Sequence, residues 1–471
     1  MPAIVNQLKS MEIPGEYGNW ITAIQDRIQF YKGNDAFFQT KKDQHNSTVY
    51  RSNMPPGPFM AKDPKCIVLL DAKSFPILFD VSRVEKKDVF TGTYMPSTSL
   101  TGGYRMLSYL DPSEEKHTQV KTLLFRLLAS RKHHVIPEFR KAYNTLFENM
   151  ELEIAKDGKS DFNAGNDQQG FEFACTSFFG VSPSSTDLGT SGPDKAAFWL
   201  VFHLHPLVSI GLPTFLEELF LHTFPLPPIF AKPSYNSLYS YFSSGATHAL
   251  DVAESLGLSR EEACHNLLFA TVFNTYGGIK ILFPGIMKCL AEADKSLHSR
   301  LASEIRREVK LEGGKVTMAA IEKMELTKSV VYEALRIDPP VKFQYGKAKV
   351  DMTIDSHDAR YDVKKGEMLF GYQPFATKDE RVFENADKFV GDRFVGEEGK
   401  KLLKYVVWSN GPETEDTTVA NKQCAGKNFV VLVGRLLVVE FFLKYDTFTG
   451  ETASTIAGLT VNVTSVTKAT S

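Results

Sequence analysis

The C-terminal part of the chain places one cysteine directly before a long apolar helix. Cys424 stands in residues 421–427 (N-K-Q-C-A-G-K), and apolar residues recur at helical spacing over residues 429–439. A thiolate at a helix N-terminus is stabilised by the helix dipole and by unpaired backbone N–H groups. The pattern predicts a helix that begins just after Cys424. A lone cysteine is more often an inert small hydrophobic residue, so the residues upstream must decide its role.

A second helix is predicted over residues 327–337, because two consecutive prolines follow and a helix ends before them. Within it Glu333 and Arg336 lie three residues apart and share one face. Alone, they would be read as a solvated surface pair that adds little stability. Arg393 follows in the aromatic-flanked run F-V-G-D-R-F, and Cys424 comes after it.

These three motifs, in this order, resemble the cytochrome P-450 superfamily. The resemblance implies a haem b cofactor whose iron is bound by Cys424, and a buried charge network of Glu333, Arg336 and Arg393 behind the haem. A buried Arg–Glu pair is tolerated only when it is fully hydrogen-bonded, so this network would fix the fold beneath the Cys424 loop.

The implied fold is mainly α with a small β subdomain, the cytochrome P-450 fold. We expect one haem-thiolate domain over residues 1–471, with the β subdomain at roughly 40–75 and 343–375 and the haem-ligand loop and helix at 408–443. Alternation and turn residues predict a strand at 66–70, a hairpin at 352–363 that turns near residues 356–358, and a strand at 368–372.

The chain departs from the monooxygenases of that superfamily at two places. An acidic polar insertion, residues 413–420, separates Trp408 from the Cys424 motif. The long central helix, which begins with the capping sequence S-R-E-E at Ser259, carries F-N-T-Y and two glycines where an acid–alcohol pair is usual. Asn274, in that run, can hydrogen-bond a peroxide oxygen but cannot supply the acid needed to split dioxygen. The alternatives are a satisfied core amide at Asn274 and a helix that ends near Gly277.

These departures resemble the plant cytochromes P-450 that metabolise fatty-acid hydroperoxides, over nearly the whole chain. The stretches that carry the likeness include N-M-P-P-G-P at 53–58, S-Y-L-D-P-S at 108–113 and Q-Y-G-K-A at 344–348. Within this group the chain is most similar to the allene oxide synthases, because Lys280 follows the two glycines and Phe90 opens F-T-G-T-Y-M-P-S, where lyases commonly have Leu.

The resemblance implies roles for individual residues. Asn274, Phe90 and Ser108 would be catalytic, and Asn274, Phe90 and Lys280 would contact the substrate. Lys280 is six residues beyond Asn274 and points about 120° away in a regular helix, so a surface lysine is the competing interpretation.

Two further residues would contact the cofactor. Lys116 and His117 resemble the family's contacts to the haem propionates, with a solvated charged face as the competing interpretation.

The expected function is that of an allene oxide synthase, or hydroperoxide dehydratase. It would convert a fatty-acid hydroperoxide, such as 13-hydroperoxylinolenic acid, to an allene oxide in oxylipin and jasmonate biosynthesis, without dioxygen or a reductase. A divinyl ether synthase or hydroperoxide lyase of the same family is the alternative. A non-catalytic haem-carrying lipid-binding protein ranks below these.

Composition excludes some partners and leaves others open. A net charge of −2 gives no sign of nucleic-acid binding, and five unpatterned cysteines favour a reducing compartment. The N-terminus has no apolar span, so we expect no transmembrane segment. The resemblance implies a plastid location, and a cytoplasmic location is the alternative because no Ser- and Arg-rich transit segment is visible. The apolar, proline-broken stretch at 197–230 suggests peripheral contact with a membrane or lipid surface, with buried helices as the alternative.

Overall fold

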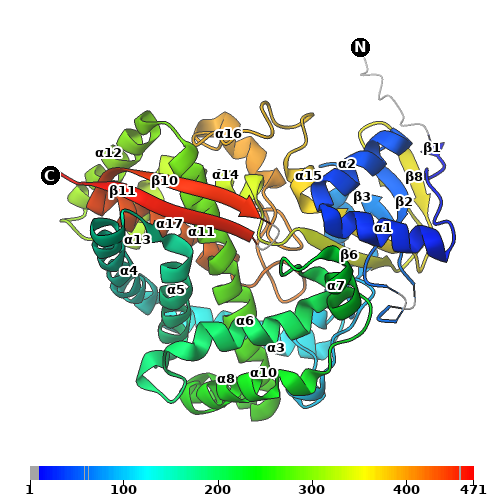
Figure 1. Ribbon diagram of the computed structural model, residues 1–471, viewed down its shortest axis with the longest axis horizontal. Coiled ribbons are helices and arrows are strands. Elements are labelled where there is room, and N and C mark those ends of the chain that lie inside the picture. The colour runs from blue at the N-terminus through cyan, green and yellow to red at the C-terminus, as the bar shows by residue number, and fades with distance from the viewer. Residues whose placement is uncertain (1–9, 58, 62, 456–457, 471) are drawn as a thin grey trace.

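The structure is a computed structural model that describes residues 10–57, 59–61, 63–455 and 458–470. It consists mainly of helices, with small sheets gathered at one side and a C-terminal hairpin that crosses the opposite side (Figure 1). The predicted mainly α fold class with small β-sheets is therefore confirmed.

The α-helices of the described chain are α1 (Trp20–Lys32), α2 (Asn34–His45), α3 (Glu115–Arg131), α4 (Val135–Asp157), α5 (Phe162–Phe179), α6 (Gly192–Leu204), α7 (Thr214–Glu217), α8 (Lys232–Gly245), α9 (Thr247–Ser255), α10 (Arg260–Leu268), α11 (Gly277–Glu292), α12 (Lys295–Leu311), α13 (Met318–Lys323), α14 (Glu325–Ile337), α15 (Gln373–Thr377), α16 (Gly396–Leu402) and α17 (Lys427–Lys444). Two π-helical segments, η8 (Glu218–His222) and η10 (Phe269–Tyr276), and short 3-10 turns, among them η3 (Leu107–Tyr109), connect them.

The central helix is one continuous run made of α10, the π-helix η10 and α11. It begins as predicted, because the Ser259 hydroxyl accepts a hydrogen bond of 3.1 Å from the Glu262 amide and caps the first turn. The two glycines do not end the helix: Gly277 is the first residue of α11, directly after the π-helical turns. A π-helix widens the turn locally and shifts which side chains share a face, which a single-period pattern cannot reveal.

The run Arg260–Glu292 is the one helix among the described residues that is long and apolar enough to cross a bilayer. The protein itself buries 56% of its most apolar window, and Figure 1 shows α10 and α11 passing through the middle of the molecule. A core helix meets the same criteria of length and hydropathy, so these criteria alone do not make it a membrane span.

The sheets are built from strands far apart in the sequence. A five-stranded sheet has the order β2 (Val49–Asn53), β3 (Lys65–Leu69), β9 (Met368–Tyr372), β6 (Phe343–Ala348), β4 (Val84–Glu85), in which β3 and β9 are parallel and the other pairs antiparallel. Two three-stranded sheets have the orders β1 (Ser10–Met11), β8 (Arg360–Val363), β7 (Met352–Asp355) and β10 (Tyr445–Thr455), β11 (Gly458–Lys468), β5 (Ser160–Asp161). The predicted strands at 66–70 and 368–372 and the hairpin at 352–363 are confirmed to within one residue.

The five-stranded sheet is buried on both faces. Along β3, Ile67 and Leu69 belong to one apolar cluster, whereas Cys66 and Val68 belong to another on the opposite face. Side chains alternate between faces along a strand, so a strand with two buried faces is apolar at every position. The larger core lies among α4, α5, α11, α14 and α17.

A buried charge network connects α14 to the segment that leads to the Cys424 loop. The Glu333 carboxylate accepts from Arg336 at 2.7 and 2.8 Å and from Arg393 at 2.9 Å. It also accepts from the Val390 amide at 3.0 Å. Arg336 donates further to the backbone carbonyls of Thr377, Ala386 and Lys388. Every charge is therefore paired and hydrogen-bonded, which is the condition for tolerating charges in a core.

We predict that Glu333→Gln destabilises the fold by about 3–5 kcal/mol, because two buried guanidinium groups would lose their counter-charge. Urea unfolding followed by far-UV circular dichroism measures this change. The control is Arg381→Gln, which breaks an exposed ion pair with Asp358 and should cost less than about 1 kcal/mol. Equal effects of the two substitutions would contradict a structural role for the network.

Candidate active site

Cys424 lies at the end of a loop that turns directly into α17. Its amide donates to the Trp408 carbonyl at 3.4 Å, and its own carbonyl accepts from the Lys427 amide at 3.2 Å. Burial raises the pKa of the Cys424 thiol, whereas a hydrogen bond from the Gly426 backbone and the charge of Lys121 act in the opposite direction. The helix N-terminus, that amide and a cation therefore favour the thiolate against the cost of burial.

The acidic insertion before Cys424 is folded back onto α17 and α14. Lys427 donates to the backbone carbonyls of Glu413 and Glu415 at 2.8 and 2.6 Å. The Tyr332 hydroxyl of α14 donates to the Glu413 carboxylate at 2.7 Å. Gln423 donates to the Pro412 carbonyl at 2.6 Å. The insertion thus holds the cysteine loop in place from both sides.

Lys422 connects the cysteine loop to two of the predicted site residues. Its ammonium donates to the carbonyls of Leu107 and Leu110 at 2.6 and 2.5 Å, on either side of Ser108. Ser108, Phe90 and Lys422 also line one small cavity of about 20 Å³. The structure therefore brings Phe90 and Ser108 next to the loop that carries Cys424.

Asn274 lies in the π-helical part of the central helix, directly after Phe273, whose ring contacts Phe90. The rings of Phe90 and Phe273 meet edge to face with centroids 5.7 Å apart. The Asn274 side chain is exposed, although Val272 and Tyr276 on either side are buried. A Cβ added at Gly278 would meet no heavy atom within 4 Å. The central helix thus presents an uncovered amide and a small residue along one stretch, beside Phe90.

Four potential cations converge around these residues. Lys86 donates to the Tyr345 carbonyl at 2.7 Å, and Lys121 donates to the backbone and side-chain oxygens of Asn421 at 2.6 and 3.1 Å. Burial lowers the pKa of Lys86 to about 7, that of Lys422 to about 7 and that of Lys121 to about 8. Burial, with Lys422 and Lys121 nearby, lowers the pKa of His117 to about 3. Buried cations of this kind need anionic partners.

The residues present fit a haem. A haem has two propionate carboxylates and requires an axial ligand, and three lysines (Lys86, Lys121, Lys422) and the neutral imidazole of His117 lie around the loop that presents the Cys424 thiol. The Nδ1 atom of His117 is buried and has no hydrogen-bond partner in the described part of the chain. The hydrogen bonds of the three lysines described above go to neutral oxygens, and none of the three forms an ion pair with a carboxylate in the described part of the chain. The Asp111 carboxylate acts on Lys86 and Lys422 only from beyond ion-pair distance. Lys86, Lys121, Lys422 and His117 would hold the propionates, and Cys424 the iron.

Two predicted residues lie in other surroundings. Lys116, half-exposed, pairs with Glu262 of α10 at 2.8 Å and does not join the four cationic groups. Lys280, also half-exposed, forms an ion pair with Asp167 of α5. The competing interpretation of a surface charge fits both positions better, and their predicted roles toward propionate and substrate remain predictions.

Sequence reasoning missed Lys86, Lys121 and Lys422. Two of them carried a local signal: Lys121 is four residues after His117 and shares its helix face, and Lys422 is two residues before Cys424. Lys86 carried none, because only the pairing of β4 with β6 brings it to the site.

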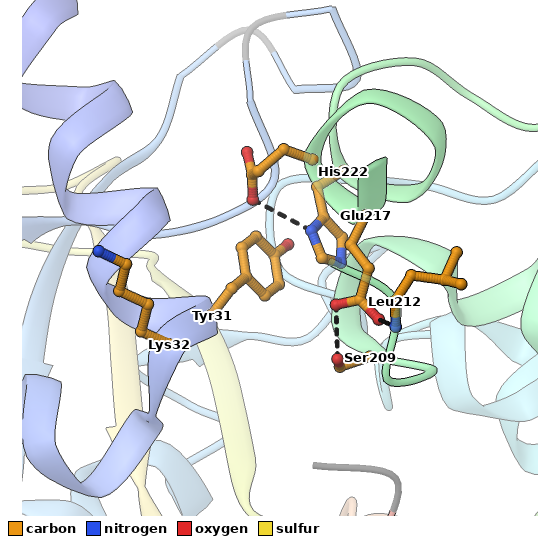
Figure 2. Close-up of a pocket in the computed structure, with 7 residues that line it drawn as sticks. Tyr31, Lys32, Ser209, Leu212, Glu217 and His222 are labelled. Atoms are coloured by element: carbon orange, nitrogen blue, oxygen red, sulfur yellow. Dashed lines mark hydrogen bonds and ion pairs between the residues drawn. The ribbon is translucent and has the colours of Figure 1, made fainter. Parts of the chain in front are cut away.

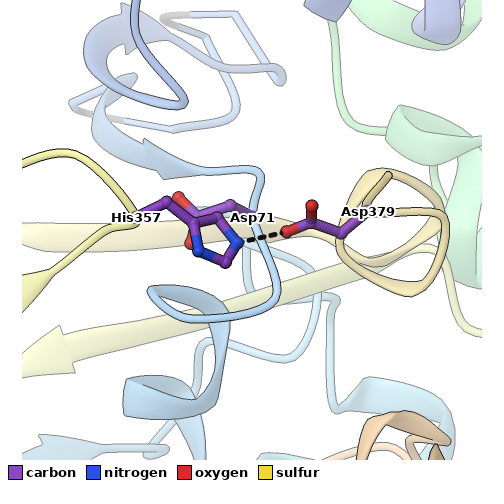
Figure 3. A group of neighbouring side chains, drawn as sticks. All are labelled: Asp71, His357 and Asp379. Atoms are coloured by element: carbon purple, nitrogen blue, oxygen red, sulfur yellow. Dashed lines mark hydrogen bonds and ion pairs between the residues drawn. The ribbon is translucent and has the colours of Figure 1, made fainter. Parts of the chain in front are cut away.

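Asp71, His357 and Asp379 form another cluster, whose possible ligand atoms all lie within 4.8 Å of one another (Figure 3). The Asp379 carboxylate bonds His357 at 2.7 Å and accepts from the Ala72 amide at 2.9 Å. Asp71 accepts from the Thr48 hydroxyl and from the amides of residues 73 and 74. The carboxylates are thus already occupied by hydrogen bonds that join the end of β3 in the five-stranded sheet to the turn between β7 and β8, which is a structural role.

Comparisons with known proteins agree with this geometry. The cytochrome P450 family model matches residues 262–447. Allene oxide synthase 2 of Oryza sativa subsp. japonica is 60% identical to the chain over 97% of the chain and 96% of the relative. The chain belongs to the cytochrome P450 family, on the branch of the allene oxide synthases.

Other relatives support the same placement. The chloroplastic allene oxide synthase 1 of Solanum lycopersicum is 55% identical over 98% of the chain and 87% of its own length. The chloroplastic allene oxide synthase of Arabidopsis thaliana is 56% identical over 97% of the chain and 89% of its own length. Membership of this family makes haem the cofactor of the protein.

The lowered pKa of Lys422 predicts a pH-dependent cost in the haem-free protein. From about pH 7 to 10 the unfolded chain holds a proton that the folded protein releases, so this contribution makes the fold more stable as pH rises. Lys422→Met removes this pH-dependent cost. The free energy of unfolding of the variant minus that of the wild type should therefore be roughly 1–2 kcal/mol larger at pH 7 than at pH 9. Urea unfolding of both haem-free proteins at the two pH values measures this gain.

In the haem-loaded protein Lys422→Met should instead be unfavourable, because a haem propionate loses its cationic partner and haem is held less tightly. Haem transfer to apomyoglobin should then become about tenfold faster. Lys365→Met, at an exposed position, is the control for both experiments. A gap in unfolding free energy that is equal at pH 7 and pH 9, with unchanged haem transfer, would contradict the assignment.

Proposed function

We propose that this protein is an allene oxide synthase that dehydrates a fatty-acid hydroperoxide, such as 13-hydroperoxylinolenic acid, to an allene oxide in oxylipin biosynthesis. The observation that carries the proposal is that one chain has both the Cys424 loop and, on its central helix, Asn274 without a carboxylic acid, and that its relatives at 55–60% identity are named allene oxide synthases. No reductase is required, because the hydroperoxide itself brings the bond that is broken.

The chain's own residues position the substrate. When bound to Cys424, haem supplies the one-electron chemistry that cleaves an O–O bond. The Asn274 amide donates a hydrogen bond to a hydroperoxide oxygen and holds that group beside Phe90. The π-helical stretch around Asn274 contains no carboxylic acid, so it offers no proton for dioxygen cleavage.

Phe90 selects between products in this proposal. Its ring lies against Phe273 and Tyr109, with centroids 5.7 and 5.5 Å away, and is fixed by two edge-to-face contacts. A fixed aromatic face stabilises an electron-poor carbon centre and favours proton loss over chain cleavage. Ser108, beside the same cavity, offers a hydroxyl for a polar group of the substrate.

Product analysis tests the function. Purified haem-loaded protein receives 13-hydroperoxylinolenic acid without NADPH or reductase, and products are identified by mass spectrometry. Ketols and cyclopentenone, which form from an allene oxide, support the proposal. Divinyl ether or short-chain aldehydes would assign the protein to a sister activity, and intact substrate beside a normal Soret band would exclude turnover of this substrate.

We predict that Asn274→Leu lowers kcat by about ten- to a hundredfold, because one hydrogen bond to the reacting group is lost. Steady-state loss of the hydroperoxide's diene absorbance measures kcat. The control is Thr275→Val, since the Thr275 hydroxyl bonds the Ala270 carbonyl within the helix at 3.0 Å. A kcat unchanged in the Asn274 variant would remove Asn274 from the mechanism.

Contact with a lipid surface is part of the proposal. The connection between α6 and α8 exposes apolar side chains, at Ile210, Leu212, Phe215, Leu219, Phe220, Phe224, Ile229 and Phe230. Such a patch, on a protein whose substrate partitions into lipid, suits a leaflet surface. We propose a plastid location, because several relatives, among them one of two from rice, are named chloroplastic.

We predict that Phe215→Ser with Phe220→Ser weakens binding to phosphatidylcholine vesicles about tenfold, because two rings that are 72% and 56% exposed would no longer enter the lipid. Vesicle flotation measures the bound fraction. Leu152→Ser with Leu311→Ser removes equally exposed leucines from α4 and α12 and should leave binding unchanged. Equal losses in the two variants would contradict the proposed surface.

A further inference from the structure

Two buried tyrosines form hydrogen bonds with histidine side chains. The Tyr109 hydroxyl lies 3.0 Å from Nε2 of His203, and the Tyr235 hydroxyl lies 2.6 Å from Nδ1 of His265. Both tyrosines are 1% exposed, and within the described residues these are the two hydrogen bonds that join a tyrosine to a histidine. A buried phenol needs a hydrogen-bond partner, but a backbone carbonyl would satisfy it equally well. The choice of a base at both positions therefore calls for a chemical reason.

Both histidines can accept a proton. Burial, with His205 nearby, lowers the pKa of His203 to about 4, and burial lowers the pKa of His265 to about 4. Both rings are therefore neutral near pH 7 and keep one unprotonated nitrogen. Burial also raises the pKa of Tyr109 and of Tyr235, so each phenol holds its proton. A neutral phenol loses an electron readily when a base within hydrogen-bond reach takes its proton at the same time, because an oxidised phenol is a far stronger acid than an imidazolium.

Trp199 of α6 lies between the two tyrosine–histidine pairs. Its ring centroid is 5.7 Å from that of His203 and 5.3 Å from that of Tyr235. The His203 ring in turn lies 5.9 Å from that of Tyr109, centroid to centroid. Indole and phenol are the aromatic side chains that lose a single electron most easily. Consecutive ring contacts therefore connect three oxidisable residues through the core.

The inner end of this series lies at the candidate active site. Tyr109 directly follows Ser108 and packs edge to face on Phe90, with centroids 5.5 Å apart. Lys422, which would hold a haem propionate, donates to the carbonyls of residues 107 and 110 on either side of Tyr109. Tyr109 is thus the member of the series that adjoins the haem-binding groups.

The outer end of the series approaches the surface on α8. Tyr239 comes one helical turn after Tyr235 on the same helix, and its ring lies 4.7 Å from that of His265, centroid to centroid. The Tyr239 side chain is half-buried, so solvent reaches part of it. The series therefore runs from the candidate site to solvent. We name Tyr109, Trp199, Tyr235 and Tyr239 the redox chain.

Another tyrosine–histidine contact lacks these features. The rings of Tyr31 and His222 stack with centroids 3.5 Å apart, beside a cavity of about 140 Å³ (Figure 2). The Tyr31 hydroxyl donates to the Pro206 carbonyl, and the two nitrogens of His222 bond the Glu218 carboxylate and the Val208 carbonyl. Tyr31 therefore has no histidine nitrogen to receive its proton. Contact between the rings alone does not create the arrangement seen at Tyr109 and Tyr235.

We propose that the redox chain carries an unused oxidising equivalent from the haem to the protein surface, where a water-soluble one-electron reductant of the ascorbate class removes it. One-electron cleavage of an O–O bond leaves an oxidising equivalent at the haem whenever the organic radical escapes before the reaction is complete. Without an outlet, that equivalent attacks the porphyrin and the residues around it. The redox chain thus protects the cofactor.

Electrons and protons balance in the inner half of the chain. Tyr109 gives one electron to the haem site and its hydroxyl proton to His203. Trp199 then gives one electron to the oxidised Tyr109, whose oxygen recovers the proton from His203. The positive charge now resides on Trp199.

The outer half restores the protein. Tyr235 gives one electron to the oxidised Trp199 and its proton to His265, and recovers that proton when Tyr239 supplies the next electron. Tyr239 releases its own proton to solvent. A hydrogen atom from the reductant returns Tyr239 to its starting state, so the net change is one electron moved from the reductant to the haem site and one proton released.

Radical trapping tests the chain in the haem-loaded full-length protein. The oxidant is cumene hydroperoxide, a nitroso spin trap captures tyrosyl radicals, and mass spectrometry locates the adducts. A second measurement follows bleaching of the Soret band. In the wild type we expect an adduct at Tyr239, and ascorbate should slow bleaching about fivefold. Trp199→Phe and Tyr235→Phe each interrupt the chain, so each should lower the Tyr239 adduct about fivefold and abolish the protection by ascorbate.

The control is Tyr143→Phe, which removes an equally buried hydroxyl that bonds Asn166 at 2.8 Å, and it should change neither quantity. Tyr235→Phe keeps its ring and loses one hydroxyl, so this variant decides the question if Trp199→Phe fails to bind haem. An unchanged Tyr239 adduct in the chain variants, or bleaching of the wild type that ascorbate does not slow, would overturn the proposal. Cumene hydroperoxide is not the substrate of the proposed function, so failure to form an allene oxide would contradict that function and leave this test intact.

Discussion

The Glu333 carboxylate is the point on which the arrangement around the cysteine depends. It accepts four hydrogen bonds, from two guanidinium groups and one amide. Two of the donors, Val390 and Arg393, belong to the irregular chain that leads to the Cys424 loop. An irregular segment lacks the regular backbone hydrogen bonds of a helix or sheet. Here hydrogen bonds to the buried Glu333 carboxylate of α14 fix its conformation instead. The Phe383 ring lies against Arg336 at 4.7 Å and excludes water from the network.

The second group of buried charges differs from the first in its balance. Around Glu333 the charges are paired within the protein, so the network needs no further partner. Lys86, Lys121 and Lys422 instead donate to neutral oxygens, and burial lowers the pKa of each. Buried cations that form no ion pair within the protein are typical of a site where a ligand supplies the opposite charge. This contrast separates a structural ion network from a binding site, although both lie near the cysteine loop.

Sequence reasoning succeeded where the determinant is local. Two prolines after residue 338 end α14 where the sequence predicted, and the turn that contains Gly366 precedes the first residue of β9. The π-helix η10 was not predicted, because its cause is the packing around Phe269–Tyr276 and not a residue type.

The candidate site shows the same division. Cys424, Phe90, Ser108 and Asn274 came from recognisable motifs. Lys86 did not, because it reaches the site only through the pairing of β4 with β6, which joins residues more than 250 positions apart. The contact of Arg27 with Glu218 is equally non-local, with 191 positions between them. Long-range pairings of this kind leave no periodic trace in a single sequence.

The absence of a carboxylic acid on η10 has a consequence for what can control the rate. A haem-thiolate site that reduces dioxygen must receive electrons, protons and substrate, and the delivery of any one of them can limit the rate. In the proposed reaction the substrate brings the bond to be broken, and the Asn274 amide only holds it. Substrate selectivity is then determined before the chemical step, by which lipid binds beside Asn274 and Phe90.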